Sequence, residues 1–441
     1  MLKLTDAIKL STADDCIITT YRSYTENIRW ANSSTTTNGT SQDDDIVIIS
    51  IINKSVGTVA ASLTDDIDIK SLIKSSEELA RKNPPAEDYT DLLSNQEQLE
   101  GSRLSETDIS NFIKPLSKVF TSAKSKSLDL FGYAELRTTE IETASSNGVH
   151  KIYHGRVGQI ELNAKTSDRQ TSVWEGQSVT SWEEQKIEKM FDRLNQKVSW
   201  SKTKIDLEPG EYTVLLEPSA VTDLLVYAYW ESAARDADEG RTVFTNLENK
   251  QGFSKEISIY SDPNEEDFKS LNFVSTVASS SHESVFDNGA TINKNNWILD
   301  GKVSGLFAPR FYAKKSNRQP AYFSENLIFN SDGGSIEELT SEIKDGLLVT
   351  CFWYIREVDP QKLLLTGLTR DGVFLIKDGK VIGAVNNFRF NMSPIDMLKN
   401  VIKIGNSEKT LAREFGDYFK LTKMPPLVVE KFNMSTKSDA L

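Results

Sequence analysis

The side chains best suited to metal chemistry in this chain are its three histidines, His150, His154 and His282. His150 and His154 are four residues apart, and on a helix this spacing would bring two imidazoles to one metal ion. Their segment, however, follows an Asn-Gly turn and precedes a β-like run, and on a strand the two rings would lie roughly 13 Å apart. We therefore predict two exposed strand histidines that share no metal, and a solvated loop position for His282.

The sequence contains no other recognisable motif for hydrolytic or nucleotide chemistry. A Gly-x-Ser-x-Gly elbow, a P-loop and a Gly-x-Gly-x-x-Gly fingerprint are all absent. The two cysteines, Cys16 and Cys351, lie far apart and lack the spacing of a metal site. Cys351 has apolar neighbours, so we interpret it as a buried strand cysteine, because a catalytic thiol would need a base beside it. Reduced thiols favour a cytoplasmic protein.

One segment, residues 346–390, concentrates polar side chains at the ends of expected strands. These are Tyr354, Arg356, Thr369, Arg370, Asp371, Asn386, Asn387 and Arg389. One interpretation is that they are surface and turn residues. The other is a cleft that grips a peptide backbone, because amide and guanidinium groups hydrogen-bond to main-chain polar groups. We expect five of them to line or support such a substrate-binding cleft: Arg356, Arg370, Asp371, Asn387 and Arg389.

Strand and helix patterns predict an α+β fold in three parts. An N-terminal α/β-type region consists of two small sheet-and-helix units, residues 1–90 and 91–208. A large, mainly antiparallel β domain follows, residues 209–441, and contains the polar segment. The last boundary rests on Pro209 and Gly210, which interrupt regular structure. Within the second unit, Ser-Ser-Asn-Gly at residues 145–148 predicts a turn between two strands.

Two helices are expected in the first 125 residues. Apolar positions predict a helix over residues 69–82, which a Pro-Pro pair ends. A second helix is expected near residues 105–123. It would start at a capping box formed by Ser105 and Asp108. Pro115 lies inside it and should kink or split it.

Two further helices are expected around the domain boundary. One, near residues 181–197, would begin at a second capping box formed by Ser181 and Glu184. The next has Pro218 in its first turn and would end before Gly240. Its buried stripe would consist of Val221, Leu224, Leu225 and Ala228.

Composition excludes two classes of partner. The formal net charge is −13 and no basic patch is evident, so we expect no nucleic-acid binding, because an acidic chain repels phosphate backbones. No apolar run approaches the ~18 residues that a membrane-spanning helix needs, and the N-terminal residues lack the apolar core of a signal peptide. We therefore expect no contact with a membrane.

The polar segment and its flanks resemble the TldD/PmbA family, on its TldE (PmbA) side. The resemblance is carried by the strings GLLVT-x-FWYIR-x-VDP, LTGLTRDG-x-FLI and VNNFRF, which span residues 346–390. This combination is long and specific. Residues 28–32 with 56–60, residues 158–168 and residues 425–432 resemble other parts of the family, so the likeness covers nearly the whole chain.

The resemblance implies a subunit of a peptidase. Family members act as TldD–TldE heterodimers, in which the TldD partner holds zinc through a His-Glu-x-x-x-His helix and a distal cysteine. The complex trims short or unfolded peptides and matures some peptide natural products. The implied partner is thus a zinc-bearing TldD-like subunit, the implied substrate is a peptide, and this chain itself has no cofactor. The family's older label, modulator of DNA gyrase, implies no DNA binding here, given the charge.

The resemblance also implies a degenerate metal motif. In the helix that follows Pro218, Trp230, Glu231 and Arg235 stand where His-Glu-x-x-x-His would stand. The glutamate is kept, and Trp and Arg replace the two ligands. Neither binds zinc at neutral pH, because arginine stays protonated and the indole nitrogen offers no lone pair. We therefore expect no metal and no catalytic residue in this chain.

Two other functions stay open on the sequence alone. The chain could be an independent, metal-free hydrolase that uses Cys351 or a pair of carboxylates. It could also be a homodimeric module that binds peptides without a hydrolytic partner.

Overall fold

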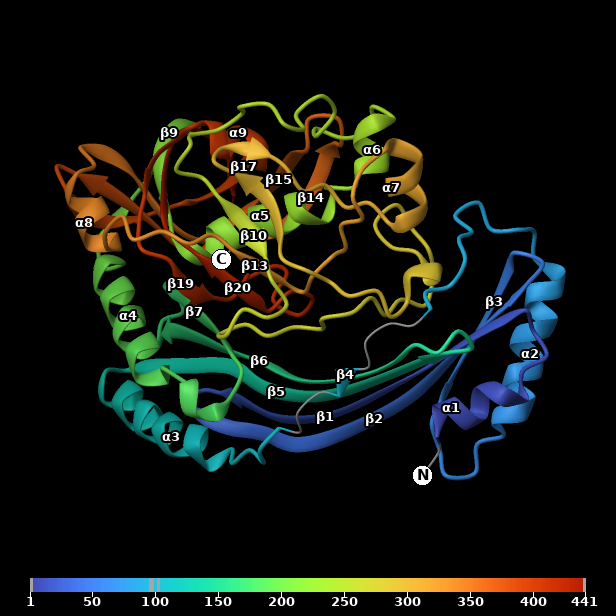
Figure 1. Ribbon diagram of the computed structural model, residues 1–441. Coiled ribbons are helices and arrows are strands. Elements are labelled where there is room, and N and C mark those ends of the chain that lie inside the picture. Colours follow the sequence, from blue (N-terminus) through green and yellow to red (C-terminus); the bar gives the residue numbers. More distant parts are fainter. Residues whose placement is uncertain (1–2, 95–98, 101–103, 439–441) are drawn as a thin grey trace.

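The computed structural model describes residues 3–94, 99–100 and 104–438. Its fold is α+β and rich in strands, so the predicted fold class is confirmed. A long curved sheet from the N-terminal region lies beneath a larger C-terminal part (Figure 1). Helices cover this sheet at its two ends. The first end carries α1 (Leu4–Ala7) and α2 (Ile69–Lys82), and the second carries α3 (Ser110–Ser125) and α4 (Ile187–Trp200).

The long sheet is built from both N-terminal units. Its strands within the described ranges are β1 (Asp15–Ala31), β2 (Ser34–Ile52), β3 (Ser55–Ser62), β4 (Leu99–Glu100), β5 (Leu128–Ser145), β6 (His150–Thr166) and β7 (Ser172–Val179). β1 pairs antiparallel with β5, from Ile17 opposite Ser145 to Trp30 opposite Gly132. The two units therefore share one continuous sheet, in the order β3-β2-β1-β5-β6-β4, with β7 also on β6.

The turn expected at residues 145–148 is confirmed and joins β5 to β6. Gly148 has φ +86°, a conformation that glycine adopts without steric cost. Its N–H donates to the Ser145 carbonyl at 3.2 Å. This tight turn holds the two long strands in register as far as Leu128 opposite Thr166.

Helix α2 confirms the prediction for residues 69–82, whereas α3 begins later than expected. Asp68 caps α2 by accepting a hydrogen bond from the Ser71 N–H at 3.1 Å. In α3 the capping box predicted from Ser105 and Asp108 does not form. Asp108 instead accepts from the Ser110 N–H at 2.9 Å, which is a local turn that delays the helix to residue 110.

Helix α3 also runs without a break through Pro115. The prediction that this proline would split the helix is wrong. Proline removes only one N–H from the helical ladder, and the buried face of α3 holds the helix in place. Phe112 in this face stacks on Trp182 with ring centroids 5.2 Å apart, and Leu116 is also buried.

Helix α4 begins at Ile187 and not at the predicted Ser181, which makes no capping hydrogen bond. A short 3-10 turn, η2 (Trp182–Glu184), precedes it. Glu184 accepts from the Thr180 hydroxyl at 2.6 Å and so does not complete a capping box. The Gln185 side chain accepts from the Ile187 N–H at 3.0 Å and takes over the role of the cap.

The C-terminal part contains two sheets within the described ranges. The larger has the order β14-β9-β21-β17-β15-β16-β8, with β18 on β21, and the smaller has the order β12-β11-β10-β13-β20-β19. The strands of the larger sheet are β8 (Lys204–Ile205), β9 (Gly210–Leu216), β14 (Asp345–Asp359), β15 (Leu364–Lys377), β16 (Lys380–Val385), β17 (Asn387–Met392), β18 (Val401–Ile404) and β21 (Leu427–Ser438). Those of the smaller sheet are β10 (Ile259–Ser261), β11 (Asn295–Leu299), β12 (Lys302–Val303), β13 (Asn326–Ile328), β19 (Glu408–Thr410) and β20 (Leu421–Met424).

Helix α5 (Pro218–Trp230) lies in the core between these two sheets. It contacts β9 and β14 of the larger sheet and β19 and β20 of the smaller. It is therefore buried around nearly its whole circumference, so the single buried stripe expected from the sequence was too narrow. The remaining helices of this part are α6 (Ala234–Asp238), α7 (Arg310–Ser316), α8 (Ile336–Ser341) and α9 (Pro394–Lys399). Short 3-10 turns are η1 (Ile8–Leu10) and η3 (Val285–Asp287).

One hydrophobic cluster joins the long sheet to the C-terminal part. It contains Trp30 and Phe112 from the N-terminal region together with Leu215 and Phe374 from the larger C-terminal sheet. This packing positions the segments that build the candidate site. Of the helices that the structure describes, none has the length and apolar character needed to cross a bilayer.

Candidate functional site

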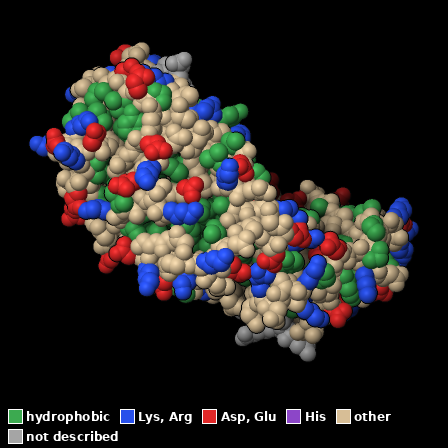
Figure 2. Space-filling model, turned by 90° about the horizontal axis from the view of Figure 1, so that it is seen from above, with side chains coloured by type: hydrophobic (Ala, Val, Ile, Leu, Met, Phe, Trp, Pro, Cys, Tyr) green, Lys and Arg blue, Asp and Glu red, His purple; other side chains and the backbone are tan. Residues whose placement is uncertain are grey.

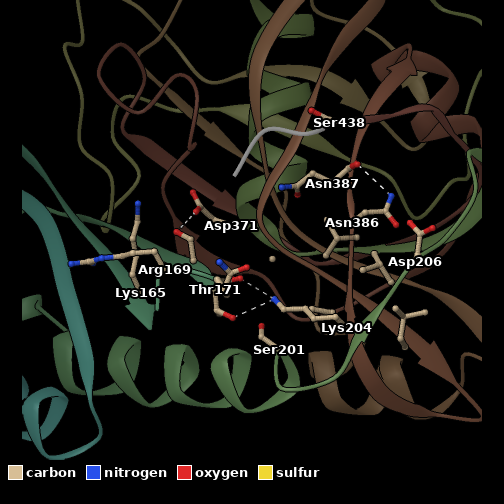
Figure 3. Close-up of a pocket in the computed structure, with 17 residues that line it drawn as sticks. Lys165, Arg169, Thr171, Ser201, Lys204, Asp206, Asp371, Asn386, Asn387 and Ser438 are labelled. Atoms are coloured by element: carbon tan, nitrogen blue, oxygen red, sulfur yellow. Dashed lines mark hydrogen bonds between the residues drawn. The ribbon is translucent and has the colours of Figure 1, made fainter. Parts of the chain in front are cut away.

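Two of the predicted site residues, Asp371 and Asn387, line one cavity of about 830 Å³ (Figure 3). Five segments form its wall: the end of β6 with the β6–β7 connection, residues 201–206 around β8, β15, the junction of β16 and β17, and the end of β21. The long sheet and the larger C-terminal sheet therefore both contribute to it. Its volume lies within the range of about 300–1,000 Å³ that is typical of small-ligand sites.

Asp371 owes its position to an irregularity in β15. It has φ +52° and Gly372 has φ +136°, and the register between β14 and β15 shifts beside them. A Cβ atom at Gly372 would lie 2.6 Å from the Thr350 hydroxyl, so glycine is required there. The Asp371 carboxylate meets the β6–β7 connection, where it accepts from the Ser172 hydroxyl at 2.6 Å.

Two neighbouring amides, Asn386 and Asn387, form another part of the wall. Asn387 Oδ1 accepts from the Thr369 hydroxyl at 3.3 Å. Asn386 Oδ1 accepts from the Leu207 N–H at 2.8 Å. Since Leu207 follows β8, this bond ties the β8–β9 connection to the end of β16. The wall can thus offer amide groups to a polar ligand.

Three basic residues that sequence reasoning missed complete the wall: Lys165, Arg169 and Lys204. Arg169 is paired with Asp129 at 2.9 Å. No local pattern indicates these residues, because they meet the 371–387 region only through tertiary folding. The arrangement contains cations, amides and a buried carboxylate, which suit binding of a polar ligand.

Arg370 does not line the cavity but belongs to a partly buried cluster beside it. Its guanidinium lies over the Trp353 ring, 5.6 Å from the centroid. Arg413 lies between Trp353 and Trp174, at 4.8 and 5.2 Å from their centroids, and its Nη1 is 2.8 Å from Glu161 Oε2. Burial raises the pKa of Glu161, and Arg413 opposes that shift. The cluster fastens the Arg413 loop between the two sheets and supports the wall that carries Asp371.

The sequence of the C-terminal part identifies the family. Residues 209–436, a little more than half of the chain, match the family described as the PmbA/TldA metallopeptidase C-terminal domain. The chain belongs to the TldD/PmbA family. Among curated proteins, none matches it.

Solved structures with the fold of this TldD/PmbA family member cover nearly its full length. TldE from Thermococcus kodakarensis has a TM-score of 0.80 at 17% identity, over 97% of this chain and 98% of that one. A candidate modulator of a DNA gyrase from Thermotoga maritima has a TM-score of 0.76 at 14% identity, over 95% of each chain. A candidate modulator of DNA gyrase from Bacteroides thetaiotaomicron has a TM-score of 0.77 at 13% identity, over 98% of each.

The other two predicted site residues of this TldD/PmbA chain lie apart from the cavity wall. Arg356 has a 57% exposed side chain, and its Nη1 lies 3.3 Å from Glu414 Oε1. Its guanidinium also covers the Tyr354 ring, 4.3 Å from the centroid. Arg389 donates to the Thr366 hydroxyl at 3.4 Å, across the β15–β17 pair. The structure therefore brings Asp371 and Asn387 together in the cavity, and places the three arginines outside it.

The expected degenerate motif does not lie on one helix. α5 ends at Trp230, Glu231 is its C-cap, and Arg235 lies in the separate helix α6. The prediction of one helix reaching to Gly240 is wrong, because the Ala234 N–H donates to the Phe307 carbonyl at 2.8 Å and draws the chain away from the helical path. Burial raises the pKa of Glu231.

The histidines of this family member are placed as strand and loop residues, but they are less exposed than predicted. His150 and His154 lie on β6 and face Glu142 at 3.0 Å and Glu140 at 3.6 Å. All three histidines are half-buried, and burial lowers the pKa of His282. Within the described part of the chain, no group of three or more His, Cys, Asp or Glu side chains is placed to hold a metal ion.

Cys351 is a fully buried residue of β14, as the apolar neighbours predicted. Its thiol donates to the Arg370 carbonyl at 3.3 Å. Burial raises its pKa well above the ordinary value, and the nearby Asp371 adds to the shift. Because the thiolate is the reactive form, this environment suppresses nucleophilic chemistry at Cys351.

We expect neither cysteine to react with a thiol reagent while the chain is folded. Burial also raises the pKa of Cys16, to about 11. A colorimetric thiol assay at neutral pH should detect no reactive cysteine in the native protein, and both cysteines after unfolding in guanidinium chloride. Rapid labelling of Cys351 in the folded chain would contradict this and would favour the cysteine-dependent hydrolase.

Proposed function

We propose that this chain is a non-catalytic, TldE-type subunit of a cytoplasmic TldD–TldE metallopeptidase. A TldD-like partner would hold the catalytic zinc. This chain would complete the chamber and help to hold the short or unfolded peptide that the complex cuts or matures. The likeness to TldE of Thermococcus kodakarensis supports this subunit type, because it extends over almost the full length of both chains.

The observation that carries the non-catalytic role is the environment of Trp230 and Arg235. Trp230 packs edge-on against Phe415, with ring centroids 5.0 Å apart. Arg235 pairs with Glu87 at 3.1 Å and with Glu239 at 3.2 Å. Both side chains make structural contacts where the family resemblance would place imidazoles. A zinc peptidase needs imidazole or carboxylate ligands around an open metal position, and neither residue can supply one.

A peptide suits this surface better than a nucleic acid. On the face seen in Figure 2, basic and acidic side chains alternate over short distances. The chain has a net charge of −13. Nucleic-acid binding depends on a concentrated array of lysine and arginine that displaces counterions from phosphates. An extended peptide needs only dispersed hydrogen-bonding groups and a sheet edge or cavity.

The test is to co-express this chain with a TldD-like subunit from the same genome. The two should elute as one complex, and the complex should cleave an unstructured peptide in a chelator-sensitive reaction. Omitting this chain should abolish cleavage. If no complex forms and the partner cleaves equally well alone, the subunit role is wrong.

The same preparation separates the two alternatives. Peptide cleavage by the isolated chain that survives a chelator but is lost on alkylation would indicate a cysteine-dependent hydrolase. A stable homodimer that binds peptide and ignores the TldD-like subunit would indicate an independent binding module. The burial of Cys351 speaks against the first of these.

A further inference from the structure

The cavity that Asp371 lines contains charged groups of both signs, and several of them are already neutralised. Arg169 Nη2 lies 2.9 Å from Asp129 Oδ2. On the opposite side, Lys437 Nζ lies 2.8 Å from both Asp206 Oδ2 and Glu208 Oε1, so this edge has one acid more than it has bases. These ion pairs set the two edges of the cavity, and neither Arg169 nor Lys437 is left as a counter-charge for a ligand.

Asp371 is also satisfied by the protein. Its carboxylate accepts from the Ser172 hydroxyl at 2.6 Å. Two guanidinium groups lie behind it, Arg370 Nε at 3.7 Å and Arg413 Nη2 at 3.9 Å. This acid therefore needs no cation from within the cavity.

Lys204 and Lys165 are different, because neither has a carboxylate at ion-pair distance among the described residues. Lys204 donates to the Gln170 carbonyl and the Thr171 hydroxyl, each at 3.2 Å. These are neutral acceptors, and an ammonium group has three donors. Lys165 lies 5.6 Å from the centroid of the Phe131 ring. Two positive charges of the cavity wall thus lack a direct ion pair within the described part of the chain.

The surroundings of Lys204 make an anion favourable there. Figure 3 shows its ammonium group extending along the cavity toward Thr171. The Lys204 side chain is exposed as a whole, yet partial desolvation lowers its pKa, and the charge of Asp168 only partly opposes that effect. An anion bound in the cavity would offset the lost hydration of the ammonium group.

We propose that this cavity is a subsite for the carboxylate of a polar ligand, with Lys204 and Lys165 as its counter-charges. The amide of Asn386 would hydrogen-bond the rest of the ligand. This assignment stands on the cavity alone and does not depend on a TldD-like partner.

A carboxylate fits better than a phosphate. Sites for phosphate usually rely on bidentate arginine or on the positive end of a helix. Here Arg169 is committed to Asp129. The cavity also meets the C-terminal end of α4, through the helix C-cap residue Ser201, and this end carries partial negative charge. With Asp371 in the wall as well, a dianion would be repelled more strongly than a monoanion.

The carboxylate can come from the C-terminus of a peptide or from a free organic acid, and a titration of the full chain distinguishes the two. The probes are N-acetyl-trialanine with a free carboxylate, its C-terminal amide, acetate and inorganic phosphate, each followed by calorimetry at millimolar concentration. We expect the free-acid peptide or acetate, both monoanions, to bind, and the amide to bind at least about tenfold more weakly, the value of one charge-assisted hydrogen bond. Tighter binding of the peptide assigns the site to peptide C-termini, and tighter binding of acetate assigns it to small acids.

Matched variants test the role of the lysines. Lys204→Gln should weaken carboxylate binding about tenfold, and Lys165→Gln should weaken it in the same direction. Lys202→Gln is the control, because Lys202 is exposed like Lys204 and lies two residues before it, but does not line the cavity. Melting temperatures check that all three variants fold. The proposal is overturned if neither carboxylate binds, if the amide binds as tightly as the acid, if phosphate binds more tightly, or if Lys204→Gln behaves like the control.

Discussion

Replacing Lys197 with methionine is expected to lower the free energy of unfolding by about 3–5 kcal/mol. Lys197 lies on α4 with only 3% of its side chain exposed, and its Nζ is 2.7 Å from both Glu175 and Glu217. Burial opposes the charge, yet the two carboxylates outweigh it and raise the pKa of Lys197. Removing the lysine would leave the buried Glu217 without its ion pair and Glu175 with only Arg193, 2.9 Å away. Leaving a buried charge unpaired is the costly way to break an ion pair.

The three residues Lys197, Glu175 and Glu217 join two parts of the fold, so losing their ion pairs should destabilise the whole chain. Glu175 lies on β7 of the long sheet, and Glu217 is the residue directly before α5 in the C-terminal core. Guanidinium unfolding of Lys197→Met and wild type measures the loss. Lys189→Met on the exposed face of α4 is the matched control and should change little. Adding Glu217→Gln to Lys197→Met should restore part of the stability, because one unpaired charge is removed. A loss below about 1 kcal/mol would show that the triad contributes little.

Local patterns in the sequence predicted helices well but predicted their starts poorly. The apolar spacing of residues 69–82 and the proline at position 218 both placed a helix correctly. The two capping-box patterns failed, because Asp108 and Glu184 hydrogen-bond to nearer groups. The pairing of β1 with β5 joins segments more than a hundred residues apart. Such a pairing depends on tertiary packing and leaves no local pattern.

The residues of the candidate site were likewise predicted only in part. Asp371 and Asn387 were indicated because polar residues at strand ends often serve function. Lys204 and Arg413 were missed, since their partners come from distant segments and nothing in their own neighbourhood marks them. The cavity is assembled from five segments of both halves of the chain. Its existence follows from the packing of the two sheets, which the sequence alone does not reveal.

Helix α5 was predicted to be amphipathic, but it is buried on nearly all sides, and Asp223 is a polar residue that this burial encloses. It lies in α5, outside the expected apolar stripe, and is completely buried. Its carboxylate accepts from the Glu414 N–H at 2.9 Å and from the Phe352 N–H at 3.4 Å. Burial nevertheless dominates and raises its pKa to about 8. Asp223 thus links α5 to β14 and to the loop that carries Arg413.

The stability of the chain should therefore depend on pH through Asp223. Because its pKa is higher in the folded chain than the ordinary 3.8, the folded state binds the proton more tightly than the unfolded state. This contribution is fully present below the ordinary value and is lost as the pH rises through about 8. Between about pH 5 and 7 the wild type should lose about 3 kcal/mol that Asp223→Asn does not lose.

Urea unfolding of both proteins across this pH range measures the difference in slope. The asparagine oxygen can still accept from the Glu414 N–H, while its NH₂ group would face the Phe352 N–H, so a constant loss of stability is expected beside the change in slope. Asp192→Asn, on the exposed surface of α4, should keep the slope of the wild type. Equal slopes for Asp223→Asn and wild type would mean that water or a neighbouring group keeps Asp223 ionised in the core. If the loop that carries Arg413 also becomes more sensitive to proteolysis as the pH rises, ionisation of Asp223 loosens the contact between this loop and α5.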